Sequence, residues 1–468
     1  MFQELLSSAD IEQIHTTSMK LLARVGVRFP DDEAIALFKK HGIRADGHLI
    51  YLSEEQVMNA VVKAPAQFTL HSRQPERNVT VGGGQPVFAP GYGAPFLIDL
   101  EVGKHRPSLE DYHNLVRLAH MLPNQDLSGH LMVEPGDAPA EAAHLQMVYA
   151  SMLHSDKPFI GSTRGGAGAR QTMELASILF GEQIGERPVT IGLINSLSPL
   201  GYSQEMIQAL MEYARWRQPL IIALLVMAGS TGPITLAGVL AQQNAEILAG
   251  ITLVQLVNPG APVIYGSTST NILMKTGALS IGSPELAQVV VATAQMARHY
   301  GLPSRSGGAL TDAHSPDAQA GAESMLGLLT AVNSGVDFIL HAAGILSSYL
   351  AFSYEKFILD DEMCGLVRRL RRGISVTPET LASELIAKVG PGGNFLMEPH
   401  TVERCRTEFW QPALYSRESL EAWMANGRPD STQRARQRWQ GLLAAHQDPP
   451  LDATTARQLR AYIEEHIH

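Results

Sequence analysis

From residue 86 onward, short apolar runs alternate with longer segments whose apolar positions recur every three or four residues. The apolar runs span 87–91, 127–133, 158–164, 189–196, 220–226, 262–268, 302–308 and 336–344. The helical windows span 108–121, 138–154, 168–183, 202–216, 234–257, 284–300, 316–334 and 346–370. Continuous apolar strands that alternate with helices predict a parallel sheet covered by helices. Eight such units favour a closed (β/α)8 TIM barrel over residues 86–372.

The two flanking segments have different patterns. Residues 1–85 predict an N-terminal α+β cap with helices at 10–24 and 31–40, a third helix that starts at the Ser53/Gln56 capping box, and the short strands QFTLHSR and NVTVGGG. Residues 373–468 predict a C-terminal helical extension packed on the barrel. A dinucleotide-binding sheet is the weaker alternative, because the glycine-rich run 165–170 lacks the GxGxxG spacing.

Composition narrows the class of protein. The net charge of −10 excludes a basic stripe for nucleic acid. Two cysteines cannot form a disulfide framework. The N-terminus lacks a signal-peptide pattern, and the longest apolar run, 220–229, is about half of a membrane span. We therefore expect a cytoplasmic protein without nucleic-acid or membrane partners.

If the fold is a barrel, its chemistry belongs at the C-terminal ends of the strands. Tyr92, His130, Arg305 and His341 occupy such ends. The stretch ALTDAHSPDAQAG, residues 309–321, follows the seventh predicted strand and so predicts part of the rim of the site. Its polar candidates for the rim are Thr311, Asp312, His314 and Gln319.

Several of these residues have a structural alternative. His130 is as compatible with a hydrogen-bonded core histidine as with a base. Arg305, on an apolar strand, needs an anionic partner, either an internal acid or the carboxylate of a substrate. Lys275 could form a Schiff base, but a solvated lysine is the stronger interpretation. The sequence shows neither clustered metal ligands nor a phosphate loop, so we expect no metal and no tightly bound cofactor.

Aromatic residues gather at the ends of the first and eighth predicted strands. Tyr92 and Phe96 lie in the first set, and the second contains Tyr354 together with Tyr349, Phe352 and Phe357. Aromatic faces attract quaternary ammonium groups. Core packing is the better interpretation for Phe352 and Phe357, so the candidates for binding a cation are Tyr92, Phe96 and Tyr354.

The chain resembles the trimethylamine methyltransferase family. The resemblance rests on IEQIHTTSMKLLARVGVRF, on the run from GGAL through VDFILHAAGILSSYLAFSYEKFILDDEM, and above all on GPGGNFLMEPHTVERCRTEFWQP. It extends over nearly the whole chain. Members of this family are TIM barrels that transfer a methyl group from an amine to the Co(I) corrinoid of a separate carrier protein. Trimethylamine enzymes carry pyrrolysine on the rim, whereas the matching region here, 317–321, holds ordinary residues.

The resemblance therefore implies the branch without pyrrolysine, which includes enzymes for quaternary amines such as glycine betaine. From their positions at the strand ends we expect Tyr92, Phe96, His130, Arg305, His341 and Tyr354 to surround the substrate. The resemblance implies that the rim faces the corrinoid carrier, and it assigns no catalytic residue. Proline betaine, carnitine and γ-butyrobetaine remain alternative substrates. A non-catalytic betaine-binding barrel and a lyase that uses Lys275 remain alternative functions, and a homo-oligomer remains an open option.

Overall fold

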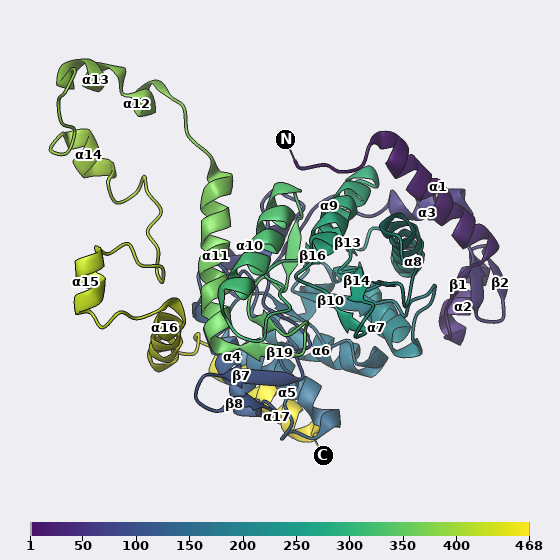
Figure 1. The fold of residues 1–468 in the computed structure, drawn as a ribbon. Helices are drawn as coiled ribbons and strands as arrows, with labels where there is room; N and C mark the ends of the chain where they lie inside the picture. The colour runs from purple at the N-terminus through teal and green to yellow at the C-terminus, as the bar shows by residue number, and fades with distance from the viewer. Residues whose placement is uncertain (1, 468) are drawn as a thin grey trace.

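The computed structural model describes residues 2–467, apart from the side chains at positions 140, 141, 182 and 183, and contains a curved parallel sheet of seven strands (Figure 1). The order along the sheet is β6-β17-β16-β13-β11-β10-β9, and every neighbouring pair is parallel. The strands are β6 (Val87–Phe88), β9 (Phe159–Ile160), β10 (Thr190–Asn195), β11 (Leu220–Ala223), β13 (Val263–Gly266), β16 (Ser304–Gly307) and β17 (Phe338–Leu340). Seven of the eight predicted strands are therefore confirmed.

The predicted strand at 127–133 is wrong. This segment has no strand conformation, and Gly129 turns it with a φ of +83°. It nevertheless lies between β6 and β9, because Asp126 N–H donates to Phe88 O at 2.8 Å and Ile160 N–H donates to Gly129 O at 3.2 Å. Phe88 N–H donates to the Asp126 carboxylate at 2.7 Å. This side-chain acceptor takes the place of the backbone carbonyl that a paired strand would provide.

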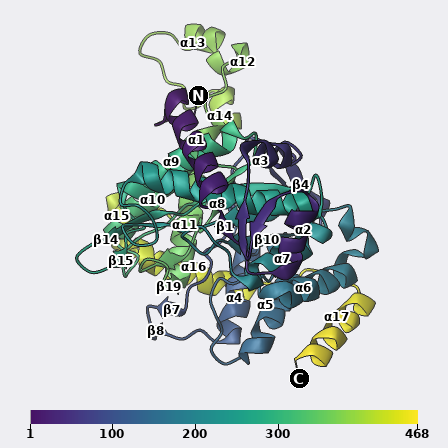
Figure 2. The same cartoon turned by 90° about the vertical axis from the view of Figure 1, so that its right-hand side faces the viewer.

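Helices follow the strands and cover the sheet (Figure 2). They are α4 (Leu109–Met121), α5 (Ala140–His154), α6 (Gly165–Phe180), α7 (Gln204–Arg215), α8 (Leu236–Val257), α9 (Pro284–His299), α10 (Ala318–Asn333) and α11 (Tyr354–Arg372). Seven agree with the predicted windows within a few residues. The eighth begins at Tyr354 rather than at 346, because residues 345–353 form two short strands instead.

Smaller sheets lie around the mouth of the main sheet. The two strands after β17, β18 (Ile345–Leu346) and β19 (Ala351–Ser353), join β7 (Phe96–Asp99) and β8 (Gly103–His105) in the order β18-β19-β7-β8. A further sheet contains β12 (Met227–Ala228), β14 (Thr270–Leu273) and β15 (Ala278–Leu279).

The N-terminal segment forms the predicted mixture of helices and short strands. It contains α1 (Ser8–Arg24), α2 (Asp32–Lys40), α3 (Glu54–Val61), β1 (Val27–Arg28), β2 (Arg44–Asp46), β3 (Leu49–Tyr51) and the antiparallel pair β4 (Phe68–Leu70) and β5 (Val79–Val81). The Ser53/Gln56 capping box is present. Phe68, Leu70 and Val81 of the β4–β5 hairpin pack into one apolar cluster with side chains of every strand of the main sheet except β16.

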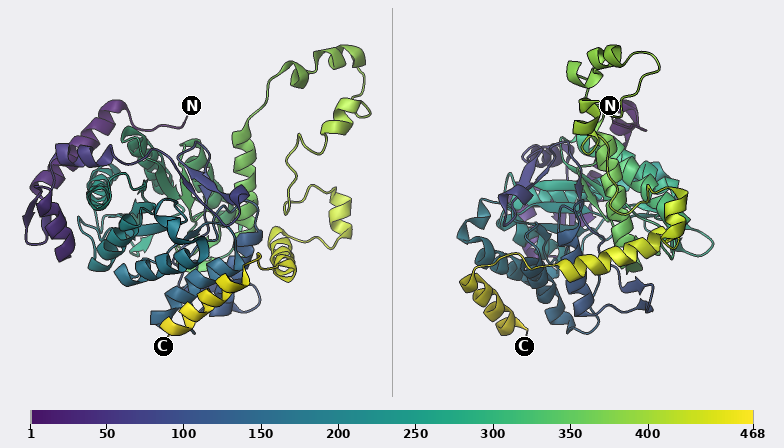
Figure 3. Two further views of the ribbon diagram at one scale, coloured as in Figure 1. Left: turned by 180° about the vertical axis from the view of Figure 1, so that it is seen from behind. Right: turned by 90° about the vertical axis from the view of Figure 1, so that its left-hand side faces the viewer.

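The C-terminal segment divides into two parts (Figure 3). The short helices α12 (Pro378–Leu381), α13 (Ser383–Val389), α14 (Pro399–Arg404) and α15 (Leu420–Ala425) extend beyond the body. The longer α16 (Ser431–Ala445) packs on α11 and α4, while α17 (Ala453–His466) packs on α5 and α6. No helix in residues 2–467 is long and apolar enough to cross a membrane.

Candidate functional site

Polar and aromatic side chains meet where the parallel strands end. Tyr92 lies a few residues beyond β6, His341 directly follows β17, Arg305 is in β16, and Thr268 follows β13. These four strands are consecutive neighbours in the sheet, so their ends lie side by side on one face. The strand order thus places Tyr92, Arg305 and His341 together, as the sequence predicts.

The His341 ring is held in one tautomer by the backbone of the first strand's loop. Tyr92 N–H donates to His341 Nδ1 at 3.1 Å, so Nδ1 is an acceptor and the ring proton belongs on Nε2. Burial, followed by the charge of Arg305, holds the pKa of His341 well below its usual 6.5. His341 is therefore a neutral ring that offers an Nε2–H donor near neutral pH.

Arg305 is a buried cation without an acidic partner among the described side chains. The residue is 2% exposed, it forms no ion pair with any side chain that the structure describes, and its Nε has no hydrogen-bond partner among them. Burial lowers its pKa to about 10, so it remains charged at neutral pH. Gly266 on the neighbouring strand makes room for it, since a Cβ there would lie 3.2 Å from Arg305 Cδ. A buried guanidinium is stable only beside an anion, which indicates a site for an anionic ligand.

Tyr349 completes this cluster, although the sequence did not single it out as a binding residue. Its ring centroid lies 4.9 Å from that of His341, at an interplanar angle of 62°. Its buried hydroxyl interacts with Arg305 and Thr268 but has no hydrogen-bond partner of normal geometry in the described chain. Burial raises the pKa of Tyr349 to about 12.

The backbone around Tyr349 is strained. His341, Ser347, Ser348 and Tyr349 all have positive φ values, of 59°, 53°, 54° and 74°. This left-handed region is uncommon for residues with a Cβ and costs on the order of 1–3 kcal/mol per residue. Such strain clusters at ligand-binding sites, where the surrounding structure maintains it.

His130 lies on the irregular segment between β6 and β9. It is buried, and its Nδ1 has no hydrogen-bond partner in the part of the chain that the structure describes. Burial lowers the pKa of His130 to about 3, with a smaller contribution from His144. A neutral ring with a free nitrogen is compatible with both interpretations from the sequence, the core histidine and the binding residue.

The titration of His130 leads to a prediction about stability. The unfolded side chain titrates near 6.5 and the folded one near 3, so between these values the unfolded chain binds more protons. We expect the free energy of unfolding to fall as the pH drops below 6.5, with a contribution from His130 on the order of 2 kcal/mol at pH 5. Urea unfolding from pH 7.5 to pH 5 should be less pH-dependent for His130→Gln than for the wild type. Equal pH slopes for the two proteins would contradict this expectation.

Phe96 and Tyr354 lie outside the Tyr92–His341 cluster. Lys104 Nζ lies 3.8 Å from the centre of the Phe96 ring. Tyr354 stacks on Trp439 with ring centroids 4.7 Å apart, and its hydroxyl donates to Asp111 Oδ1 at 3.1 Å. A face of each ring is therefore already in contact with another side chain of the protein. Phe352 and Phe357 pack in the core, as expected.

The predicted rim has a structural inner part and an exposed outer part. Thr311 is buried, and its hydroxyl donates to Glu323 at 2.5 Å. Asp312 accepts from Ile281 N–H at 2.9 Å and from the Ser348 hydroxyl at 2.6 Å, so it joins two loops. His314 and Gln319 are exposed and remain candidates for contact with a partner. Lys275 is exposed between β14 and β15, in agreement with a solvated lysine.

A group of possible metal ligands lies elsewhere, between the end of α5 and the segment that joins α16 to α17. Ligand atoms of His154, His446 and Asp448 lie within 4.8 Å of one another. Without an ion the carboxylate already pairs with both rings, at 2.6 Å from His154 Nδ1 and 3.0 Å from His446 Nε2. The sequence could not indicate this group, because His154 is almost 300 residues from the other two.

Sequence comparisons agree on one family, and a solved structure has a similar fold. The family model described as trimethylamine methyltransferase (MTTB) matches residues 2–467. A glycine betaine methyltransferase of Desulfitobacterium hafniense (strain Y51) is 48% identical over 463 residues, which are 98% of this chain and 96% of that protein. A proline betaine:corrinoid methyltransferase of Eubacterium limosum is 33% identical, over 99% of this chain and 98% of its own. Among solved structures, the monomethylamine methyltransferase MtmB of Methanosarcina barkeri has a TM-score of 0.56 at 12% identity and covers 94% of this chain and 88% of its own.

Proposed function

We propose, from the premise that the chain belongs to the trimethylamine methyltransferase (MTTB) family, that it transfers one N-methyl group of glycine betaine to the Co(I) corrinoid of a separate carrier protein. The family membership makes the chain a methyltransferase. The observation that carries the substrate class is Arg305, a buried cation at the strand ends that pairs with no acid in the described part of the chain. A betaine supplies the missing carboxylate, whereas trimethylamine has none.

The reaction needs no proton donor. The corrinoid acceptor supplies the electron pair of the new bond to carbon, and the pair of the broken C–N bond stays on nitrogen. Dimethylglycine therefore leaves as a neutral amine. This protein then has to orient one methyl group and exclude water, which is a task of positioning. The neutral state of His341 agrees with it, because that ring serves as a hydrogen-bond donor and not as an acid.

The cluster offers two kinds of contact to a zwitterion. The Arg305 guanidinium, His341 Nε2–H and the Tyr349 hydroxyl form a clamp for the carboxylate. The rings of Tyr92 and Tyr349 are then available to contact the trimethylammonium group. This group has no N–H donor, so only aromatic faces, the shape of the pocket and its electrostatic field can recognise it. A carboxylate bound at Arg305 neutralises the guanidinium charge. It also fixes the orientation of the substrate, with the ammonium group pointing away from Arg305.

The acceptor has to approach the open end of the sheet. We infer that the segment 126–129, which bonds to both β6 and β9, closes the seven strands into a barrel and that the substrate enters at the strand ends. The exposed His314 and Gln319 are our candidates for contact with the corrinoid carrier. Proline betaine is the main alternative substrate, since a relative with 33% identity carries that name.

The experiment that tests this function is a substrate panel. Glycine betaine, proline betaine, carnitine and trimethylamine are each incubated with the protein and reduced cobalamin, and the demethylated amine is identified by mass spectrometry. We expect dimethylglycine from glycine betaine and no dimethylamine from trimethylamine. Tight betaine binding without any demethylated product would show a binding protein instead of an enzyme.

Recognition of the cation leads to a separate prediction. Replacing Tyr92 with leucine keeps most of the apolar area and removes the aromatic face, so it should weaken the binding of glycine betaine by about 0.5–2 kcal/mol. The control ligand is 3,3-dimethylbutanoate, in which a neutral carbon replaces the ammonium nitrogen. Calorimetry should show that the wild type prefers betaine and that the variant has lost much of this preference. Equal affinities of the wild type for the two ligands would exclude recognition of the cation.

A further inference from the structure

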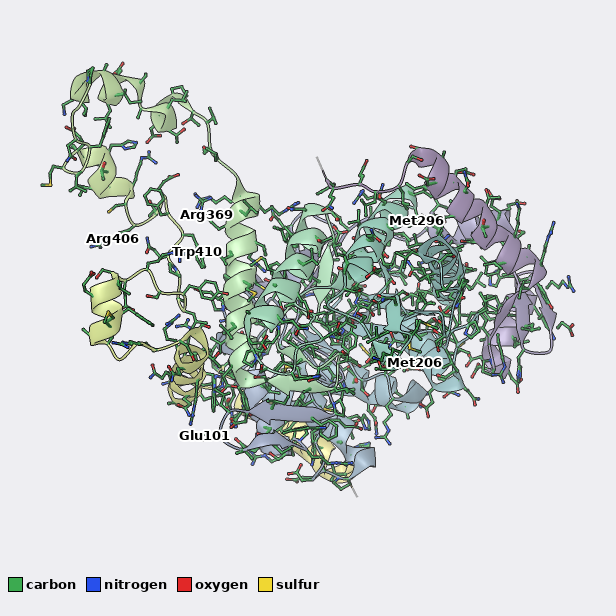
Figure 4. The ribbon with its side chains drawn as sticks, viewed as in Figure 1. Glu101, Met206, Met296, Arg369, Arg406 and Trp410 are labelled. Atoms are coloured by element: carbon green, nitrogen blue, oxygen red, sulfur yellow. The ribbon has the colours of Figure 1, made fainter. Side chains whose placement is uncertain are left out.

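An exposed arm leaves the body after α11. The arm, residues 374–409, contains α12, α13 and α14, and none of its residues is buried. Figure 1 shows that it projects beyond the sheet and its helices. The arm returns to the body where Arg369 donates to Glu408 O at 3.0 Å and Trp410 reaches Gly365 of α11; Figure 4 shows Arg369, Arg406 and Trp410 along this connection.

The exposed surface of the arm is strongly apolar. Nine large apolar side chains are exposed on it: Ile374, Val376, Leu381, Ile386, Phe395, Leu396, Met397, Val402 and Phe409. Helices of four to seven residues are marginal in water by themselves, so such an arm needs a surface to pack on. Covering these side chains would remove roughly 700 Å² of apolar surface, close to the ~800 Å² per partner of a standard stable interface.

The same chain carries an open apolar groove at its opposite end. The groove has a volume of about 590 Å³ and is lined by α1, α8 and α9, with Leu5, Leu236, Ala237 and Val289 among its side chains. Figures 1 and 3 both place α1 and the arm on opposite sides of the body. The arm of one molecule therefore cannot reach its own groove.

The position and the chemistry of the arm argue against the corrinoid carrier as its partner. The arm begins at the far end of α11, about 28 Å along that helix from the strand ends. There Arg371 donates to Val332 O at 3.3 Å, near the start of β17. A carrier that delivers its corrinoid to the site has to dissociate again, and such transient contacts are smaller and more polar. A dense apolar surface fits a permanent partner.

We propose that the arm of one copy packs into the α1–α8–α9 groove of a second copy of this chain. The groove then covers part of the apolar surface of the arm, the surface around it meets the rest, and a symmetric exchange of arms gives a closed assembly. The assembly stabilises the arm and leaves the strand ends of each copy open to substrate and carrier.

The first test is the molar mass in solution. We expect the wild type to have a multiple of 50.7 kDa by light scattering after size-exclusion chromatography. The double variant Leu396→Asp/Met397→Asp changes side chains that are 69% and 85% exposed, so the body should still fold, and its mass should fall to that of one chain. The matched control Val62→Asp/Val102→Asp changes side chains that are 78% and 70% exposed outside the arm and the groove, and should keep the wild-type mass. A monomeric wild type, or an arm variant with the wild-type mass, would overturn the proposal.

The second test identifies the receiving surface. Ala237→Trp fills the groove at an exposed position and should also give single chains, whereas Ala444→Trp on α16 should not. A photo-crosslinker placed at Met397 in a mixture of light and heavy-isotope chains should join light peptides to heavy peptides of α1, α8 or α9. Crosslinks only within one chain, or an Ala237→Trp protein with the wild-type mass, would refute this placement. Glycine betaine binding measured on each variant keeps this test separate from that of the proposed activity.

Discussion

Replacing Arg305 with methionine will lower kcat/KM for glycine betaine by roughly 30- to 1,000-fold. The variant loses a charged, paired contact with the substrate carboxylate, which is worth on the order of 2–4 kcal/mol. Methionine fills much of the same volume, and in the free protein it removes a buried charge that has no acidic partner among the described side chains. We therefore expect the melting temperature to stay the same or to rise while turnover falls.

This combination separates the two interpretations of Arg305. An arginine in an internal ion pair would leave an unpaired acid behind, and its loss would lower the melting temperature. Arg305→Lys is the conservative control. Lysine keeps the positive charge but lacks the planar guanidinium that can donate to both carboxylate oxygens, so this variant should retain part of the activity. A marked loss of stability in Arg305→Met with normal turnover per folded molecule would show that the guanidinium is structural.

His341→Asn is expected to lower kcat/KM about 10- to 100-fold while the fold remains stable. Asparagine tolerates the left-handed φ of 59° at this position, but it does not place a donor where the imidazole Nε2–H lies. The loss of a hydrogen bond to a charged group costs on the order of 1.5–3 kcal/mol. Kinetics and thermal melting of the same preparation check both parts of the prediction.

Two further observations test the role assigned to His341. His341→Val places a β-branched residue at a positive φ and leaves Tyr92 N–H without its acceptor, so it should also lose stability. Because burial keeps the pKa of His341 well below 6.5, kcat/KM of the wild type should not fall between pH 8 and pH 6 through this ring. An acid limb near pH 6.5 that disappears in His341→Asn would contradict the neutral-donor role.

The main sheet was predictable because apolar residues are continuous in its strands and recur every three or four residues in its helices. Seven apolar runs became strands, and the windows between them became helices. The run at 127–133 is as apolar as the others, but Gly129 and the Asp126 side chain interrupt its backbone pairing. Residues 346–353 resembled the start of a helix, but β19 pairs with the distant strand β7, and β18 pairs with β19. Long-range pairing of this kind leaves no local signal in one sequence.

The candidate site was predictable where residues occupy strand ends and less so in the loops. Arg305 and His341 follow from the strand register, and Tyr92 follows from the neighbouring first strand. Tyr349 reaches the cluster because four non-glycine residues, among them Tyr349 itself, have positive φ values. Positive φ is predictable from sequence mainly at glycine, so this backbone path could not be foreseen. Phe96 and Tyr354 fit the same aromatic pattern, but their rings contact Lys104 and Trp439 instead.

Methyl transfer from a betaine to the corrinoid changes the absorption spectrum of the acceptor. Reduced free cobalamin is mixed with the protein and glycine betaine under anaerobic conditions, and the change from Co(I) to methyl-Co(III) is followed by absorbance. We expect conversion that depends on both protein and glycine betaine, proceeds much more slowly with Arg305→Met, and does not occur with trimethylamine. Conversion with trimethylamine, or equal rates for the wild type and Arg305→Met, would contradict the proposed function.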